Sequence, residues 1–171
     1  AKEVLPLISS TPVEAIFPSG DTDTRYLQAR FGLAASDLVQ ISSSFISFAA
    51  EILRYIENHW CMIVEDIEKG TINSEIRMPD NVRERLMTKI IPMPERAAEL
   101  RAIFEEGFDK PFATRVWKHL QLVSGVGTGA FEIYEKKIKE RYVDERVQFY
   151  FSGLNSTEGL FSVPITMNDK T

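Results

Sequence analysis

The sequence predicts an α/β fold in which a helix-rich segment is followed by a strand-helix-strand unit of a mostly parallel sheet. A long apolar stripe at helical spacing indicates a helix in the middle of the chain. From Leu120 the pattern changes, and two β-branched or aromatic runs flank a helical one. A strand, a helix and a strand in this order favour a right-handed crossover between two parallel strands.

The first elements of the chain are short. Residues 1–20 contain three prolines, so we expect short strands and turns there, including an apolar run at residues 13–17. A helix follows, with Asp23 or Thr24 as its N-cap and Gly32 near its end. Its apolar residues recur at helical spacing: Tyr26, Leu27, Phe31 and Ala34.

The next two elements are a strand and the longest helix. Residues 37–42 alternate as a strand does, and the serines at 42–44 are expected to form a turn and a helix cap. Gly70 is expected to end the long helix, whose charged face is predicted to be solvated. Its apolar stripe consists of Phe45, Phe48, Ala49, Ile52, Leu53, Ile56, Trp60, Ile63, Val64 and Ile67.

The sequence after residue 80 predicts two short helices and then a strand-rich last third. Two shorter helices are expected at residues 81–89 and 95–106, because Pro92 and Pro94 forbid one continuous helix. The last third then contains strands at 120–126, 147–152 and 160–165, a helix through Phe131, Tyr134, Ile138 and Tyr142, and a turn at 155–159. No linker or repeat interrupts the chain, so we expect one segment, residues 1–171, with no internal boundary.

Composition excludes several classes of function. The chain has 171 residues with 20 basic and 25 acidic side chains, and its net charge of −5 disfavours a broad nucleic-acid surface. The single cysteine, Cys61, forms no internal disulfide, and His59 and His119 give no metal-ligand spacing. No apolar run is long enough to span a bilayer, and no signal-like start is present. We therefore expect a cytoplasmic protein without a membrane partner.

A glycine-rich turn is the first candidate site. The sequence SGVGTGA, residues 124–130, joins a predicted strand to a predicted helix. Glycine lets the backbone approach a ligand, and a helix N-terminus favours an anion. The pattern matches neither common nucleotide fingerprint, so a purely structural turn is the alternative.

The segment GLNSTEG, residues 153–159, is the second candidate. It follows the carboxyl end of a predicted strand, where ligands collect in open α/β sheets. The hydroxyls of Ser156 and Thr157 suit phosphate oxygens, and the carboxylate of Glu158 suits a hard cation. The alternative is a turn that satisfies its own amides, with Glu158 in solvent.

Several motifs resemble one family. The run FYFSGLNSTEGLFSVPI is similar to the second ATP motif of the Gretchen Hagen type acyl acid amido synthetases, in the firefly-luciferase superfamily of adenylate-forming enzymes. Trp117 with the later Thr128-Gly129-Ala130-Phe131 resembles the family's tryptophan and Thr-Gly-Ala-Met turn. The runs FISFAAEILRYIENHW and EDIEKGTI resemble two further family segments, and the likeness is collinear over residues 13–164.

The resemblance implies a fold, a reaction and a set of sites. It implies the central part of the large N-terminal domain of an enzyme that uses ATP and magnesium to activate a small carboxylic acid as an acyl-adenylate. An amino acid then displaces AMP. The residues that it implies are Glu158 and Thr157 for catalysis, Glu158 for magnesium, Ser156, Thr157, Glu158, Leu154, Thr128 and Gly129 for ATP, and Phe45, Ala49, Phe131 and Tyr134 for the acid.

The chain also departs from the family pattern. Leu154 stands where the family has an aromatic residue that stacks on adenine, so Phe149 or Phe151 would have to supply that ring. The family's first phosphate loop would precede Ala1 and its ribose-binding aspartate would follow Thr171. We therefore expect an internal part of a larger enzyme, inactive by itself.

The sequence is compatible with two other functions. The same adenylate chemistry could pass the acyl group to coenzyme A or another thiol. A non-catalytic binding or scaffold domain of the same fold is the other alternative, which Leu154 encourages.

Overall fold

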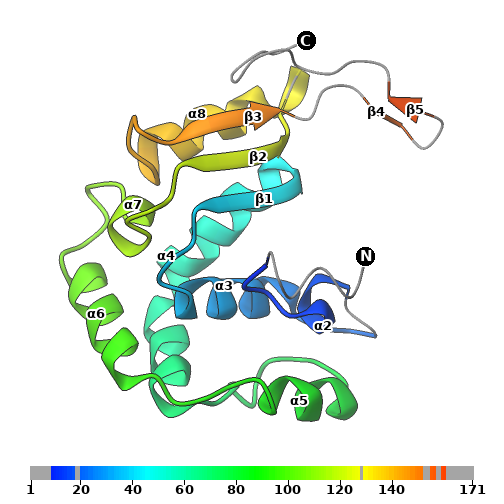
Figure 1. Cartoon of the computed structure of the whole chain (residues 1–171), viewed down its shortest axis with the longest axis vertical. Helices are drawn as coiled ribbons and strands as arrows, with labels where there is room; N and C mark the ends of the chain where they lie inside the picture. The colour runs from blue at the N-terminus through cyan, green and yellow to red at the C-terminus, as the bar shows by residue number, and fades with distance from the viewer. Residues whose placement is uncertain (1–8, 18–19, 128, 152–154, 157–158, 161–171) are drawn as a thin grey trace. The chain divides into compact units, whose positions relative to one another are not determined.

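The computed structural model describes residues 9–17, 20–127, 129–151, 155–156 and 159–160. The chain forms two compact units (Figure 1). The helical unit comprises Ala1–Ser36 and Arg54–Gly107, and the sheet unit comprises Asp37–Leu53 and Phe108–Thr171. Each unit combines two stretches that are separated in the sequence, so the two units are defined by which residues pack together and not by order along the chain. The expectation of one segment without an internal boundary stays a prediction.

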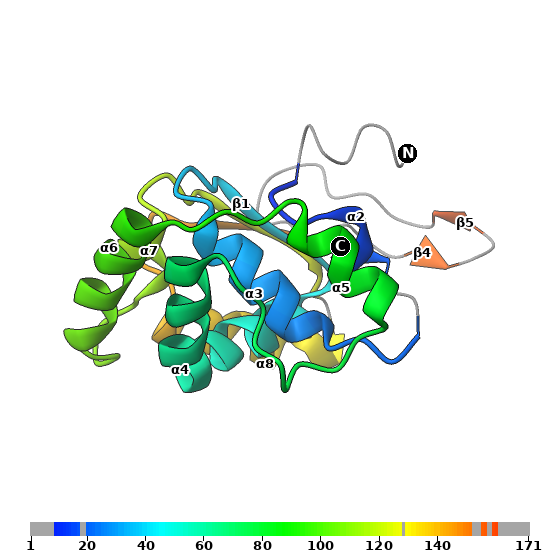
Figure 2. The ribbon, with the colours of Figure 1, turned by 90° about the horizontal axis from the view of Figure 1, so that it is seen from below.

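Five helices contribute to the described part of the helical unit, which Figure 2 shows from below. They are α2 (Val13–Ile16), α3 (Thr24–Ala34), the greater part of α4 (Ile46–Lys69), α5 (Asp80–Met87) and α6 (Pro94–Glu105). No helix among the described residues is long and apolar enough to cross a membrane.

Local signals set the ends of these helices. The Asp23 carboxylate accepts a hydrogen bond from the Tyr26 amide and caps α3, as predicted. Gly70 ends α4 with φ +68°, and a Cβ there would lie 2.5 Å from the Pro92 nitrogen, so only glycine fits. Pro94 begins α6, where its missing N–H costs nothing.

Two sequence predictions about local structure are wrong. Residues 13–16 form one turn of helix, α2, and not a strand, because the amides of Ala15 and Ile16 both reach the Pro12 carbonyl. The serines at 42–44 form no turn, because β1 runs through them to Phe45. Parallel pairing with a neighbouring strand outweighs the local preference of serine for turns.

The sheet unit contains a parallel three-stranded sheet in the order β1-β2-β3. Its strands are β1 (Gln40–Phe45), β2 (Leu122–Val126) and β3 (Gln148–Phe151). Between β2 and β3 lie a short 3-10 turn, η1 (Gly129–Phe131), and α8 (Glu132–Arg141), which confirms the predicted strand-helix-strand unit with parallel neighbours. The unit also has the short helix α7 (Ala113–Val116), which the sequence did not predict.

A second, two-stranded sheet follows. In it β4 (Asn155–Ser156) pairs antiparallel with β5 (Gly159–Leu160). Asn155 and Ser156 are therefore paired backbone, whereas the sequence predicted a turn from residue 155 onward. The strand predicted at 160–165 lies almost wholly outside the described residues.

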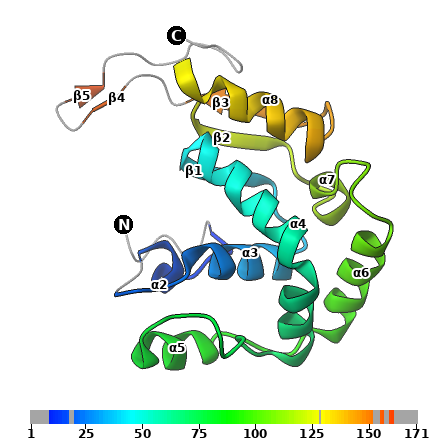
Figure 3. The same ribbon diagram turned by 180° about the vertical axis from the view of Figure 1, so that it is seen from behind.

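Helices cover one face of the three-stranded sheet. Figures 1 and 3 show α8 and the first turns of α4 on the same face. Val123 and Phe149 are fully buried, and the Lys139 ammonium of α8 lies 4.8 Å from the Phe149 ring centroid. Because side chains alternate along a strand, the next register row, Ser42, Ser124 and Tyr150, projects to the opposite face.

A buried polar network joins α3 to the end of α4 in the helical unit. The Asp66 carboxylate accepts hydrogen bonds from the Tyr26 hydroxyl at 2.7 Å, the Thr71 hydroxyl at 2.8 Å and the Asn73 amide at 3.1 Å. The Arg30 guanidinium donates to the Thr71 and Asp66 carbonyls. Burial raises the pKa of Tyr26 well above its ordinary value, and the hydrogen bond that the Tyr26 hydroxyl donates to Asp66 and the negative charge of Asp66 raise it further.

We predict that Tyr26→Phe destabilises the α3–α4 pairing by about 1–3 kcal/mol, because it removes a donor from a buried carboxylate. Hydrogen exchange of the α3 and α4 amides in the whole protein measures this loss. Tyr55→Phe is the control, since the Tyr55 hydroxyl makes no hydrogen bond within the described residues, and should change stability by less than about 0.5 kcal/mol. Equal effects of the two changes would contradict the network's role.

Candidate functional site

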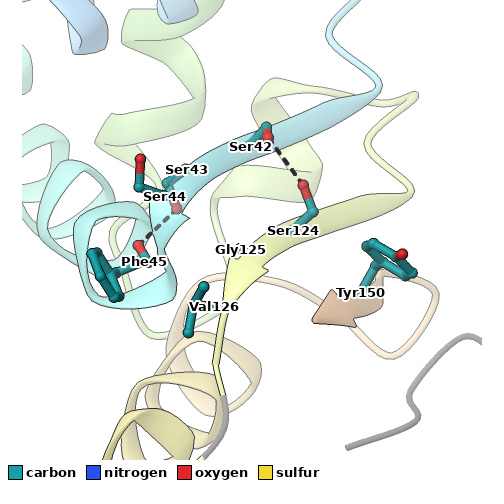
Figure 4. Close-up of a pocket in the computed structure, with 8 residues that line it drawn as sticks. All are labelled: Ser42, Ser43, Ser44, Phe45, Ser124, Gly125, Val126 and Tyr150. Carbon is teal, nitrogen blue, oxygen red and sulfur yellow. Dashed lines mark hydrogen bonds between the residues drawn. The ribbon is translucent and has the colours of Figure 1, made fainter. Parts of the chain in front are cut away.

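A pocket of about 440 Å³ opens at the carboxyl end of β1 and β2. Figure 4 shows its lining, in which Tyr150 of β3 lies beside β2. The lining residues are Ser42, Ser43, Ser44, Phe45, Ser124, Gly125, Val126 and Tyr150. None of these side chains carries a charge, and four of them are serines. The pocket therefore offers hydroxyl groups and two aromatic rings, those of Phe45 and Tyr150, to a bound molecule.

Hydrogen bonds orient the hydroxyls of Ser43 and Ser124 in the pocket. The Gln40 side-chain amide donates to the Ser124 hydroxyl at 2.8 Å, and that hydroxyl donates to the Ser42 hydroxyl at 3.1 Å. The Ser43 hydroxyl donates to the Phe45 carbonyl at 2.8 Å, at the point where β1 becomes α4. Figure 4 draws the bond from Ser124 to Ser42 and the bond from Ser43 to Phe45.

Close packing against backbone at Gly125 and against a side chain at Gly127 explains two glycines of the predicted glycine-rich turn. A Cβ on Gly125 would lie 2.7 Å from the Ser43 carbonyl oxygen and 3.3 Å from the Ile46 nitrogen. A Cβ on Gly127 would lie 2.0 Å from the Phe151 ring. Gly129 has open space around it but φ +63°, a conformation that glycine adopts without strain. Thus Gly125 lets β2 approach the start of α4.

An aromatic cluster adjoins the pocket through Phe45. The Phe45 ring stacks on Phe131 with centroids 5.1 Å apart, and Phe48 meets Phe45 edge-on at 5.9 Å. Phe131 contacts Tyr134 at 6.4 Å. Phe45 and Phe48 are 39% and 49% exposed, so the cluster presents apolar surface to solvent.

The structure brings together three of the four residues predicted to bind the acid: Phe45, Phe131 and Tyr134. The fourth, Ala49, is only 2% exposed and lies in the core. Phe48 joins the cluster although the sequence placed it in the core stripe of the long helix. Phe45 is the last residue of β1 and not part of α4, so the helical spacing of the two residues could not predict their edge-on contact.

Most of the predicted nucleotide site lies outside the described residues. This applies to Thr128, Leu154, Thr157 and Glu158, and of Ser156 only the backbone, in β4, is described. The replacement rings suggested for adenine stacking are excluded by burial, because Phe149 and Phe151 are 0% and 2% exposed. Within the described ranges, no three His, Cys, Asp or Glu side chains gather where they could hold a metal ion.

A parallel α/β sheet with a pocket at its carboxyl edge defines a class of proteins that bind small molecules there. Residues 2–147 match the model of the GH3 family N-terminal domain, and the chain belongs to this family.

Curated relatives agree with this assignment. Indole-3-acetic acid-amido synthetase GH3.8 of Oryza sativa subsp. indica is 28% identical over 73% of this chain and 21% of its own length. Probable indole-3-acetic acid-amido synthetase GH3.11 of Oryza sativa subsp. japonica is 27% identical over 92% of this chain and 27% of its own. The chain thus spans about a quarter of these relatives.

A solved structure shows the same fold. The GH3.15 acyl acid amido synthetase superposes with a TM-score of 0.77 and 20% sequence identity, covering 91% of this chain and 28% of that one. The predicted α/β class, with a helix-rich segment and a parallel strand-helix-strand unit, is therefore confirmed.

We predict that Gly127→Ala destabilises the pairing of β2 with β3 by about 1–3 kcal/mol, because the new methyl group overlaps the Phe151 ring. Hydrogen exchange of the β2 and β3 amides in the whole protein measures the effect. Adding Phe151→Leu should make the double variant lose less than the sum of the two single losses. Strict additivity would show that the two residues do not clash.

Proposed function

We propose that this chain is the central part of the adenylation domain of an ATP-dependent acyl acid amido synthetase. The match of residues 2–147 to the GH3 family supports this proposal, as do relatives named amido synthetases. Since the chain spans about a quarter of those relatives, the activity belongs to the whole protein that contains it. That protein activates a carboxylic acid as an acyl-adenylate and transfers the acyl group to an amino acid.

The aromatic cluster supports binding of the acid at the carboxyl edge of the sheet. Phe45, Phe131 and Tyr134 supply flat, apolar surface for the non-reacting part of the acid. Phe45 also lines the hydroxyl-rich pocket, so a single molecule at this edge meets both surfaces. Relatives are named for indole-3-acetic acid, whose ring system is aromatic.

The chemistry of the pocket distinguishes the uncharged ring of the acid from the phosphates of ATP. Its lining contains no cation to balance a negative charge, which favours the uncharged part of the acid here and not the phosphates. We assign the phosphates to Ser156 and Thr157, whose hydroxyls donate to phosphate oxygens, and keep Thr128, Gly129 and Leu154 as nucleotide contacts. Gly129 precedes α8 in η1, consistent with a close backbone approach.

Glu158 is the proposed magnesium ligand. A carboxylate oxygen is the donor that this hard cation prefers, and the bound cation would neutralise charge on the phosphates as the acid's carboxylate attacks the α-phosphorus. The contribution of this chain lies in orienting the acid at the sheet edge and the phosphates at residues 156–158.

We predict that the whole protein, given ATP, magnesium, an aromatic carboxylic acid and a mixture of amino acids, forms an amide and releases AMP. Mass spectrometry identifies the conjugate. Coenzyme A is included in a parallel reaction, because a thioester in place of an amide would assign the protein to the thiol-acceptor ligases. Absence of ATP binding in calorimetric titration would instead indicate a scaffold.

We predict that Glu158→Gln in the whole protein lowers acyl-adenylate formation by about a hundredfold or more, since each ~1.4 kcal/mol of lost transition-state stabilisation is tenfold in rate. Acid-dependent exchange of pyrophosphate into ATP measures this step. Glu145→Gln is the matched control, because Glu145 is exposed and has no partner among the described residues, and the rate should stay within about twofold of the parent's. Exchange at the parental rate in Glu158→Gln would remove this residue from the reaction.

A further inference from the structure

One row of side chains crosses all three parallel strands on the face opposite the helices. Ser42 pairs in register with Ser124, and Ser124 pairs with Tyr150. All three side chains line the pocket, as Figure 4 shows. The row brings together segments 82 residues apart in the sequence, measured between Ser42 and Ser124.

The hydrogen bonds of this row run in one direction. The Gln40 amide nitrogen acts only as a donor, so the Ser124 oxygen accepts from it. Ser124, 7% exposed, has its own hydroxyl proton directed to the Ser42 oxygen. The Ser42 oxygen is therefore the acceptor of that bond, and its proton points elsewhere. Among the described residues the Ser42 hydroxyl donates to none, and Ser42 is exposed at the pocket.

This arrangement leaves the Ser42 hydroxyl proton available to donate to a ligand. A hydroxyl with its oxygen already engaged loses less rotational freedom on binding than a free one, so the cost of forming the next hydrogen bond is reduced. The uncharged lining matches a neutral acceptor, because an anion would leave its charge without a cation in the pocket. Phe45, beside the row, provides the apolar surface that an attached ring would cover.

We propose that Ser42, oriented by Gln40 and Ser124, is the donor of a polar subsite that binds an uncharged oxygen acceptor on the ring of the acid substrate. Ether, carbonyl and hydroxyl oxygens are acceptors of this class. The inference rests on the proposed function, because it takes the ligand of the pocket to be the acid. It adds a selectivity: ring-oxygenated acids are preferred over acids of the same shape that lack the oxygen.

Matched pairs of acids test this subsite. Methoxyphenylacetic and ethylphenylacetic acids have similar volumes and differ by one ether oxygen, and the ortho, meta and para isomers of each are used. We expect the whole wild-type protein to prefer the methoxy acid, in kcat/KM for adenylation, at one ring position. Ser42→Ala should lower that methoxy-to-ethyl ratio by about threefold to tenfold, the range for one neutral hydrogen bond.

Two further variants complete the design. Gln40→Leu removes the amide that orients the row while Ser42 remains, and it should lower the same ratio even if Ser42→Ala fails to fold. Ser44→Ala is the matched control, because Ser44 lines the pocket but takes no part in the row, and the ratio should change by less than about twofold.

The outcomes separate this inference from the proposed function. Adenylation of both acids, without a methoxy preference at any position or with a ratio unaffected by Ser42→Ala and Gln40→Leu, overturns the subsite and leaves the proposed function standing. Adenylation of no acid at all overturns both.

Discussion

The apolar stripe of α4 is the constraint on which the rest of the structure depends. One continuous helix supplies core residues to both units, since its first turns belong to the sheet unit and the remainder to the helical unit. Its fully or almost fully buried side chains are Ile46, Ala49, Leu53, Ile56, Ile63, Val64 and Ile67. Burying each of the isoleucine, leucine and valine side chains contributes roughly 1.5–3 kcal/mol, so polar substitutions along the stripe would affect both cores.

The start of α4 also explains where the candidate site lies. β1 passes directly into α4 at Phe45, and Gly125 allows β2 to pack against this junction without a side chain between them. The row of Ser42, Ser124 and Tyr150 therefore lies beside Phe45, whose ring stacks on Phe131. Polar and apolar recognition surfaces adjoin because the strand-to-helix junction leaves no room for an intervening segment.

Charged side chains in the helical unit have a structural role. Three arginines donate to main-chain carbonyls at the ends of helices or in loops, where backbone acceptors lack helical partners. They are Arg30, which binds the Thr71 and Asp66 carbonyls, Arg83, which binds the Ile72, Asn73 and Ile76 carbonyls, and Arg96, which binds the Leu33 and Ala35 carbonyls. No buried side-chain polar atom in the described residues lacks a hydrogen-bond partner.

The sequence by itself determined the elements whose signals are local. Periodicity, caps and helix-ending residues such as Gly70 identified α3, α4, α5, α6 and α8 within a few residues, and the strand-helix-strand order predicted parallel pairing. Only the tertiary structure decided that the serines at 42–44 belong to a strand, that Phe48 is exposed, and that Ser42 accepts from Ser124. These outcomes depend on contacts between residues far apart in the chain, and local spacing carries no information about which distant strand will pair.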